Sequence, residues 1–261
     1  MTDWAGELIR LRAKGQPFAV VTVTAVSGSG PREPGAKMLV RADRSIWGTI
    51  GGGNLEHQAI QDAQTVIANG QAKVERYPLG AKTGQCCGGT MDLFFEPMNH
   101  GPRLYLFGAG HVAQAVCRIL EGTPFLVHVI DDRETWVQSP VLSDAVIRHE
   151  CEWDEFVREA IWDADRTYVA VMTYRHDTDQ AIIEKVSELP AKYIGLIGSE
   201  AKWSRFQQRM EAKGISGERI NRVKCPLGLP TGGKSPSEVA ISLAAELLQK
   251  YHGVAGEHSG S

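Results

Sequence analysis

The residues with the clearest potential for chemistry form the run Gly84-Gln85-Cys86-Cys87-Gly88-Gly89. Adjacent cysteines do not form a relaxed disulfide with each other, because neighbouring Cα atoms lie only about 3.8 Å apart. The flanking glycines let the backbone bend sharply and approach a ligand closely. Two sulfur ligands in such a loop suit a soft metal or a transferable sulfur atom. The alternative is that two small buried cysteines pack beside a turn.

A second group of residues is Gly108-Ala109-Gly110-His111-Val112-Ala113, which follows an expected strand at 103–107 and opens an expected helix. In this pattern Gly108 allows a tight turn, Gly110 lets backbone N–H groups approach a phosphate, and Ala113 lets the helix pack closely on the strand. Asp131 ends the next expected strand, at the spacing usual for a carboxylate that binds a ribose hydroxyl. The pattern predicts a Rossmann-type fold. It leaves NAD(P) binding open, because a fold does not determine a function.

A third candidate is the turn Gly51-Gly52-Gly53, which precedes an expected helix at 55–68 with Asn54 or Gly53 as its N-cap. Backbone N–H groups at such a turn could hold an anion, such as a phosphate of a cofactor. A tight connection between strand and helix, with no ligand, explains the same residues equally well. Both interpretations stay open at this point.

The segment 228–235 matches the letters of the phosphate loop, G-x-x-x-x-G-K-S. Pro230 stiffens the loop where a phosphate would need free N–H donors, and Pro236 directly follows Ser235. Nucleotide hydrolysis is therefore a minor hypothesis. An anion contact from Lys234 stays open.

The pattern of expected elements changes at the linker 97–102, which is rich in proline and polar residues. Before it, short strands and two helices predict a smaller mixed α/β domain over 1–97. After it, strands alternate with helices, which is typical of a doubly wound parallel sheet, here over 103–252. The residues 253–261 are rich in glycine and serine and predict a disordered tail.

The composition of the 261-residue chain limits the classes of function. A formal net charge of −3 gives no footprint for nucleic acid or for an anionic membrane. No apolar run approaches the roughly 20 residues of a membrane-spanning helix, and the N-terminal residues do not resemble a secretion signal. Five cysteines, an odd number, favour a reducing cytoplasm over a disulfide framework.

Six motifs in order give the chain a resemblance to the accessory proteins of xanthine dehydrogenase, the XdhC/CoxI type. The matching stretches are Ser29-Gly30-Pro31-Arg32-x-Pro34-Gly35-Ala36, Gly48-Thr49-Ile50-Gly51-Gly52-Gly53-x-Leu55-Glu56, Gly84 to Gly89, Gly108 to Ala113, Tyr193 to Ser199, and Pro226 to Leu229 with Pro236 to Leu243.

The resemblance implies a carrier of the molybdenum cofactor rather than an enzyme. Such a carrier assists sulfuration of the cofactor with a cysteine desulfurase and inserts the cofactor into xanthine dehydrogenase or a related molybdenum hydroxylase. Cys86 and Cys87 are then candidates for contact with molybdenum or its sulfur, and Gln85 for a hydrogen bond. The turn 51–53 is a candidate contact with the cofactor, which is molybdopterin or its dinucleotide form. A homodimer is also expected from the resemblance.

Two other functions are carried as alternatives. The first is an NAD(P)-dependent oxidoreductase that binds its cofactor through Gly108, Gly110 and Asp131. The second is a nucleotide-hydrolysing switch that uses Lys234.

Overall fold

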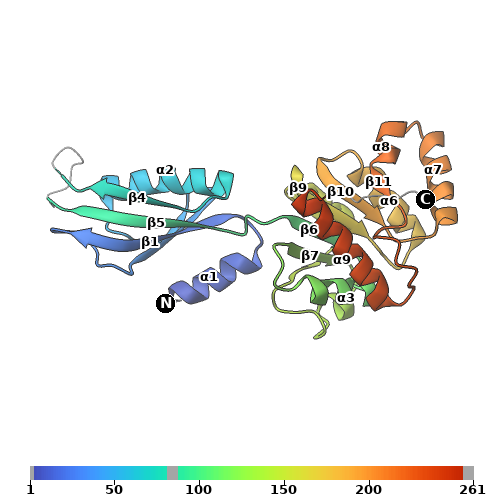
Figure 1. Ribbon diagram of the computed structural model, residues 1–261, viewed down its shortest axis with the longest axis horizontal. Coiled ribbons are helices and arrows are strands. Elements are labelled where there is room, and N and C mark those ends of the chain that lie inside the picture. Colours follow the sequence, from blue (N-terminus) through green and yellow to red (C-terminus); the bar gives the residue numbers. More distant parts are fainter. Residues whose placement is uncertain (1–2, 81–87, 255–261) are drawn as a thin grey trace. The chain divides into compact units, whose positions relative to one another are not determined.

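The structure is a computed structural model, and it describes residues 3–80 and 88–254. These residues divide into two compact units, one ending at His100 and the other starting at Gly101 (Figure 1). The candidate cysteine loop residues Gln85, Cys86 and Cys87 lie outside the described residues, as does most of the expected C-terminal tail.

The first unit is an antiparallel sheet with two helices. Its elements in chain order are α1 (Trp4–Ala13), β1 (Phe18–Ser27), β2 (Lys37–Arg41), β3 (Ile46–Gly48), α2 (Gly53–Asn69), β4 (Lys73–Pro78) and β5 (Thr90–Met98). The strands lie in the order β3-β2-β1-β5-β4, and every neighbouring pair is antiparallel.

Alternating side chains of β1 divide the first unit into two apolar layers. Ala19, Val21 and Val23 pack in one buried cluster with the apolar face of α2. Phe18 and Val20 pack on the opposite face, in a cluster that includes Leu11 of α1. The two faces explain why β1 is a nearly continuous apolar run rather than an alternating one.

The second unit is a parallel sheet with helices on both faces. Its elements are β6 (Arg103–Phe107), α3 (His111–Leu120), β7 (Leu126–Asp131), α4 (Glu134–Val137), β8 (Ile147–Glu150), α5 (Trp153–Glu159), β9 (Asp163–Val171), α6 (His176–Val186), β10 (Ala191–Leu196), α7 (Glu200–Ala212), α8 (Gly217–Asn221), β11 (Val223–Lys224) and α9 (Pro236–His252).

The strand order β11-β10-β9-β6-β7-β8 is that of a doubly wound Rossmann sheet. Helices α3 and α9 supply buried residues to the core on one face, and α5, α6, α7 and α8 supply the core on the other (Figure 1). The order reverses between β6 and β9. Ligands of open α/β sheets bind outside the carboxyl ends of the strands at such a point, so the fold itself indicates where to look. The predicted fold class is confirmed.

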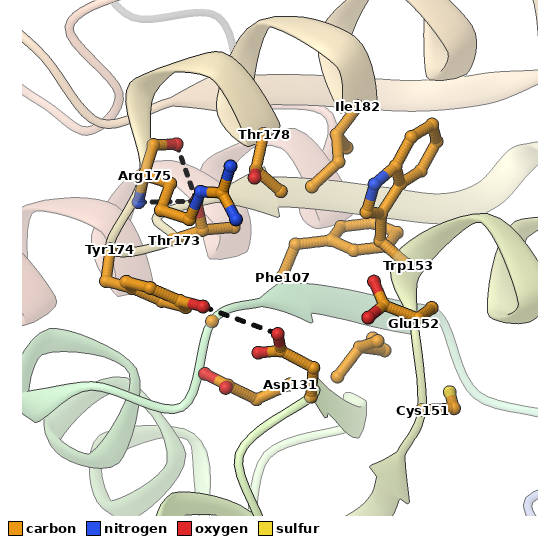
Figure 2. Close-up of a pocket in the computed structure, with 13 residues that line it drawn as sticks. Phe107, Asp131, Cys151, Glu152, Trp153, Thr173, Tyr174, Arg175, Thr178 and Ile182 are labelled. Carbon is orange, nitrogen blue, oxygen red and sulfur yellow. Dashed lines mark hydrogen bonds between the residues drawn. The ribbon is translucent and has the colours of Figure 1, made fainter.

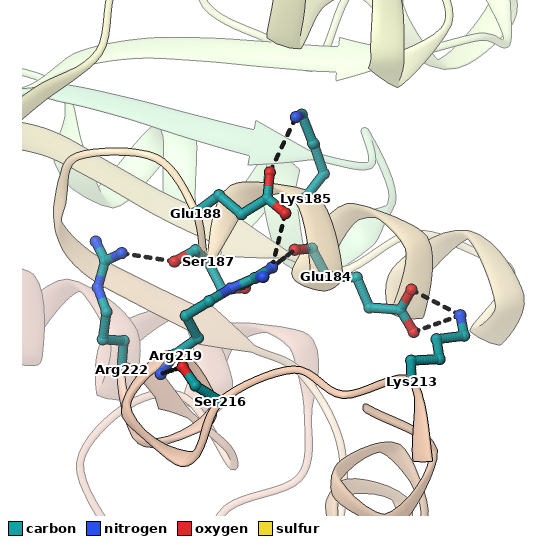
Figure 3. Close-up of polar contacts among 8 residues, drawn as sticks. All are labelled: Glu184, Lys185, Ser187, Glu188, Lys213, Ser216, Arg219 and Arg222. Atoms are coloured by element: carbon teal, nitrogen blue, oxygen red, sulfur yellow. Dashed lines mark hydrogen bonds and ion pairs between the residues drawn. The ribbon is translucent and has the colours of Figure 1, made fainter. Parts of the chain in front are cut away.

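Three short elements, α4, α8 and β11, were not expected from the sequence. Helix α8 contributes through two arginines that reach the carboxyl end of α6 (Figure 3). Arg219 Nη2 donates to the Glu184 carbonyl at 2.6 Å, and Arg222 Nη1 donates to the Ser187 carbonyl at 2.6 Å. These cations satisfy carbonyls that have no partner inside α6 and lie favourably at the negative end of its dipole.

Candidate functional site

A pocket opens at the carboxyl ends of β6, β7 and β9, where the strand order reverses (Figure 2). Sequence-distant segments meet there because the parallel strands end at one edge of the sheet. The residues that line the pocket are Phe107, Gly108, Ile130, Asp131, Asp132, Cys151, Glu152, Trp153, Thr173, Tyr174, Arg175, Thr178 and Ile182.

Gly108 supports this edge of the pocket at the end of β6. Its φ of +106° is one that L side chains rarely adopt, and an added Cβ would overlap the carbonyl oxygen of Met172. Gly110 is different: it is the N-cap of α3 in an extended conformation, and open space surrounds the position of a Cβ. Ala113 is fully buried in the core beneath α3. Gly108 and Ala113 therefore have packing roles, and Gly110 leaves room beside the turn.

The Asp131 carboxylate is buried and engaged within the protein. Oδ2 accepts from the Ala109 backbone N–H at 2.7 Å, and both carboxylate oxygens accept from the Arg133 guanidinium at 2.7 Å. Burial tends to raise the pKa of Asp131, but the hydrogen bonds from Arg133 and Ala109 outweigh it and hold this pKa below its usual value. A ribose could bond this carboxylate only by displacing part of that set.

Arg133 in turn fixes the aromatic wall of the pocket. Its guanidinium carbon lies 4.1 Å from the centroid of the Tyr174 ring, a cation–π contact. The Tyr174 hydroxyl donates to Asp132 Oδ2 at 3.3 Å (Figure 2). Sequence reasoning singled out Asp131 alone. The neighbouring Tyr174 and Glu152 were missed, although both follow strands of the parallel sheet.

In the first unit, the turn 51–53 is occupied by a carboxylate of its own helix. Glu56 Oε1 accepts from the N–H groups of Ile50 at 3.0 Å and Gly52 at 2.9 Å. It also accepts from Thr49 Oγ1. A phosphate at the same donors would have to displace Glu56, since two anions do not share them.

The expected N-cap of this helix was wrong. Helix α2 begins at Gly53 and its N-cap is Gly52, whereas Asn54 or Gly53 was predicted. The carboxylate of Glu56 gathers the preceding N–H groups, so no asparagine cap is used.

Three of the family-like motifs of the first unit converge in space. An added Cβ at Gly51, whose φ is +131°, would overlap the Pro31 ring. Gly89 approaches the carbonyls of Ser27 and Ser29 equally closely. The loop 27–32 thus contacts the glycine turn and the residues that directly follow the cysteine run. Arg32 is exposed at this place and has no hydrogen-bond or ion-pair partner within residues 3–80 and 88–254.

The segment 228–235 does not present its serine to a ligand. The Ser235 hydroxyl and N–H both donate to a carboxylate oxygen of Glu238, at 2.6 and 3.0 Å, in a capping box at the start of α9. A serine used in this way is unavailable to a magnesium ion, so the geometry does not favour nucleotide hydrolysis. Lys234 nevertheless lines a second pocket, beside Gly198 and Val239.

The other cysteines of the described residues show no ligand-type arrangement. Cys117 is buried in the core, and burial raises the pKa of its thiol to about 12. Over residues 3–80 and 88–254, no group of three or more His, Cys, Asp and Glu side chains is placed to hold a metal ion. In the same part of the chain, no helix combines the length and apolarity needed to cross a bilayer.

The folds and the pocket define a two-unit α/β protein whose second unit is of the Rossmann type. A family model described as the XdhC Rossmann domain matches residues 104–247, and a model described as the XdhC and CoxI family matches residues 11–78. The chain belongs to the XdhC and CoxI family.

Curated relatives agree with this membership. The chain is 30% identical over 254 residues to the Escherichia coli protein YqeB, covering 96% of this chain and 46% of that protein. It is 30% identical over 168 residues to a Bacillus subtilis protein named as a probable xanthine dehydrogenase component, covering 64% and 48%. It therefore spans about half the length of these two relatives.

A third relative and a solved structure cover more of both chains. The molybdenum cofactor insertion chaperone PaoD of Escherichia coli is 22% identical over 265 residues, covering 89% of this chain and 83% of that protein. A crystal structure of a xanthine dehydrogenase from Bacillus halodurans matches with a TM-score of 0.51 and 20% identity, covering 97% of each chain. At this identity the solved structure supports the fold alone.

Proposed function

We propose that this protein binds the molybdenum cofactor, assists its sulfuration, and inserts it into xanthine dehydrogenase or a related molybdenum hydroxylase. The observation that carries the proposal is the similarity to PaoD, a molybdenum cofactor insertion chaperone, over most of both chains. Family membership over both units supports it. The protein then acts as a carrier and releases its cargo unchanged or sulfurated.

The cargo binds, in this proposal, where the three motifs of the first unit meet. The cofactor is an anionic pterin that bears a phosphate and a molybdenum–dithiolene centre. Arg32 offers it an exposed guanidinium next to Gly51, and guanidinium groups bind phosphate bidentately. Gln85, Cys86 and Cys87 immediately precede Gly88 and Gly89 in the chain, so their amide and soft sulfur groups are candidates for the metal end.

The Gly51–Gly53 contact is narrowed by the geometry. Because Glu56 holds the N–H groups of this turn, we propose that the turn positions Pro31 and Arg32 rather than binding the phosphate itself. Contact of the cofactor with Gly53 stays a prediction.

An NAD(P)-dependent oxidoreductase has less support. Asp131, the expected ribose ligand, is engaged by Arg133 and by Ala109 N–H. Gly110 and Ala113 keep the geometry of the fold without adding a proton donor for hydride chemistry.

The experiment is retention of the cofactor under anaerobic conditions. Purified protein is mixed with free molybdenum cofactor, separated by gel filtration, and analysed for molybdenum and pterin in the protein fraction. We expect co-elution for the wild type and a loss of at least about tenfold in affinity for Cys86→Ser and Cys87→Ser, because a hydroxyl is a hard donor. Cys225→Ser, a half-buried thiol of the second unit, is the matched control.

Arg32→Gln tests the phosphate contact, with Arg44→Gln in an exposed turn as its control. The first should weaken retention of the cofactor and the second should not. No retention by the wild type would reject the carrier function. Full retention and client activation by both serine variants would reject only the role of the sulfurs.

The partners are part of the proposal. We expect a molybdenum hydroxylase and a cysteine desulfurase to co-purify with the protein from a cytoplasmic extract, and we expect a homodimer in sedimentation. Neither nucleic acid nor membrane is expected as a partner, given a formal net charge of −3.

A further inference from the structure

The pocket of the second unit presents a carboxylate that has no task in the fold. Glu152 is the N-cap of α5, yet its side chain makes no capping hydrogen bond. Across the described ranges 3–80 and 88–254, no hydrogen bond or ion pair engages this carboxylate. It is exposed and lines the pocket beside Trp153, as Figure 2 shows. An exposed carboxylate alone is ordinary, but this one borders a pocket at the switch point of the sheet.

The cations of the same pocket are already paired. Arg175 Nη2 donates to Asp177 at 2.7 Å, and Arg133 is held by Asp131. The pocket, as lined by the described residues, therefore offers a free hydrogen-bond acceptor and no unpaired guanidinium. This chemistry selects a ligand group that donates hydrogen bonds, and it disfavours a phosphate inside the pocket.

An aromatic ring stands ready beside that acceptor. Arg133 covers one face of the Tyr174 ring, and the hydroxyl of Tyr174 is hydrogen-bonded to Asp132. The residue is nevertheless 54% exposed, so its other face is available to a flat ligand. Fixing the ring in advance lowers the entropic cost of stacking a heterocycle on it.

We propose that this pocket binds a flat heterocycle by its 2-amino-4-oxopyrimidine edge. The ring N–H and the 2-amino group of that edge are adjacent donors, and they match the two oxygens of the Glu152 carboxylate. Tyr174 stacks on the ring. Pterins and guanine share this edge, so either a pterin cofactor or a guanine nucleotide fits. For a pterin the inference rests on the proposed function, and it adds a second contact with the cargo in the Rossmann unit.

A divalent cation is the competing occupant of a site with Asp132 and Glu152. The structure offers it little, because the described residues contain no cluster of three or more His, Cys, Asp or Glu side chains placed as metal ligands. Dialysis with and without EDTA distinguishes the two occupants.

The test is equilibrium dialysis of the full chain against two matched pairs of probes. Pterin is compared with lumazine, which carries an oxygen in place of the 2-amino group. Guanosine monophosphate is compared with inosine monophosphate, which lacks that amino group. We expect at least about tenfold tighter binding of the amino-bearing member of one pair or both, since a charged acceptor loses a donor in the other member.

Substitution of the acceptor completes the test. Glu152→Gln replaces one acceptor oxygen by a donor and should abolish the preference. Glu155→Gln, on the same helix and outside the pocket, should keep it. Selectivity for pterin alone identifies the cofactor as the source of the ligand, and selectivity for guanosine monophosphate alone identifies a nucleotide.

Three results would overturn the site: equal binding within both pairs, no retention of any probe at millimolar concentration, or binding that EDTA removes. Since no probe contains molybdenum, the outcome is independent of the retention experiment. A protein that keeps the cofactor but shows no pterin or guanine selectivity has the proposed function without this site. The reverse result keeps the site and rejects the function.

Discussion

Glu56 Oε1 lies 2.9 Å from the backbone nitrogen of Gly52, four residues earlier in the chain. The carboxylate thus occupies the anion position at the turn that opens its own helix, α2. Burial raises the pKa of Glu56, but hydrogen bonds from Thr49, Gly52 and Ile50 outweigh burial and leave this pKa below 4.5. A glycine turn that looks like an anion site in the sequence is already filled from within.

Replacing this carboxylate should destabilise the first unit. For Glu56→Ala we expect a loss of about 2 kcal/mol in the free energy of unfolding at pH 7, because several N–H donors lose a charged acceptor. Urea unfolding followed by circular dichroism measures the loss. Glu96→Gln, an exposed position on β5, is the control and should change stability by less than about 0.5 kcal/mol.

The same substitution has a defined pH dependence. The pKa of Glu56 is lower in the folded than in the unfolded protein, so its stabilising contribution is fully present above about pH 4.5 and is lost as pH falls through the folded value. The stability gap between wild type and Glu56→Ala should therefore shrink on acidification below pH 4.5. A gap that widens there would contradict the geometry of the turn.

The two glycines at the start of the Rossmann unit should respond differently to a methyl group. Gly108→Ala should cost about 3 kcal/mol or more, from its positive φ and overlap with the Met172 carbonyl. Gly110→Ala, with an extended backbone and open space, should leave the unfolding midpoint nearly unchanged. Comparable losses in both variants would show that the turn is packed differently.

Asp131→Asn should loosen the wall of the second-unit pocket. The neutral amide cannot hold the Arg133 guanidinium as the carboxylate does, so we expect a loss of about 2 kcal/mol in stability at pH 7. This pKa too is depressed in the folded state, and the effect should fade as pH drops below about 4. Asp132→Asn, at an exposed neighbour, serves as the control.

The arginines of α8 give a prediction about stability alone. Arg222→Ala removes donors to the carbonyls of Ser187, at 2.6 Å, and Leu189, at 2.8 Å, and should cost about 2 kcal/mol. Lys185→Ala removes an exposed ion pair with Glu188 and should cost less than about 1 kcal/mol (Figure 3). Thermal unfolding of both variants compares the two costs, and equal costs would argue against the carbonyl contacts.

Most of the fold could be predicted because local patterns specify it. Alternation of apolar strands and helices after residue 102 indicated the parallel sheet, and Gly108, Gly110 and Ala113 indicated the turn at its centre. Helix α8 and strand β11 were missed because five-residue and two-residue elements carry too little periodicity.

The candidate site was predictable only in part. Asp131 was placed correctly at the end of β7, but nothing in its spacing shows that Arg133 and Ala109 N–H engage it. Arg32 and Glu152 have no distinctive local pattern. Their interest comes from neighbours that are distant in the chain, and single-sequence reasoning does not supply those neighbours.

The sequence alone determined the class of the fold, the place of its ligand-binding edge and the family resemblance. These depend on periodicity and on glycines whose backbone requirements are local. Only the tertiary structure decided which polar groups are already engaged and which are left for a ligand. The reason is physical: a carboxylate or guanidinium binds whatever the folded chain brings within about 3 Å, and that proximity is set by packing between segments far apart in sequence.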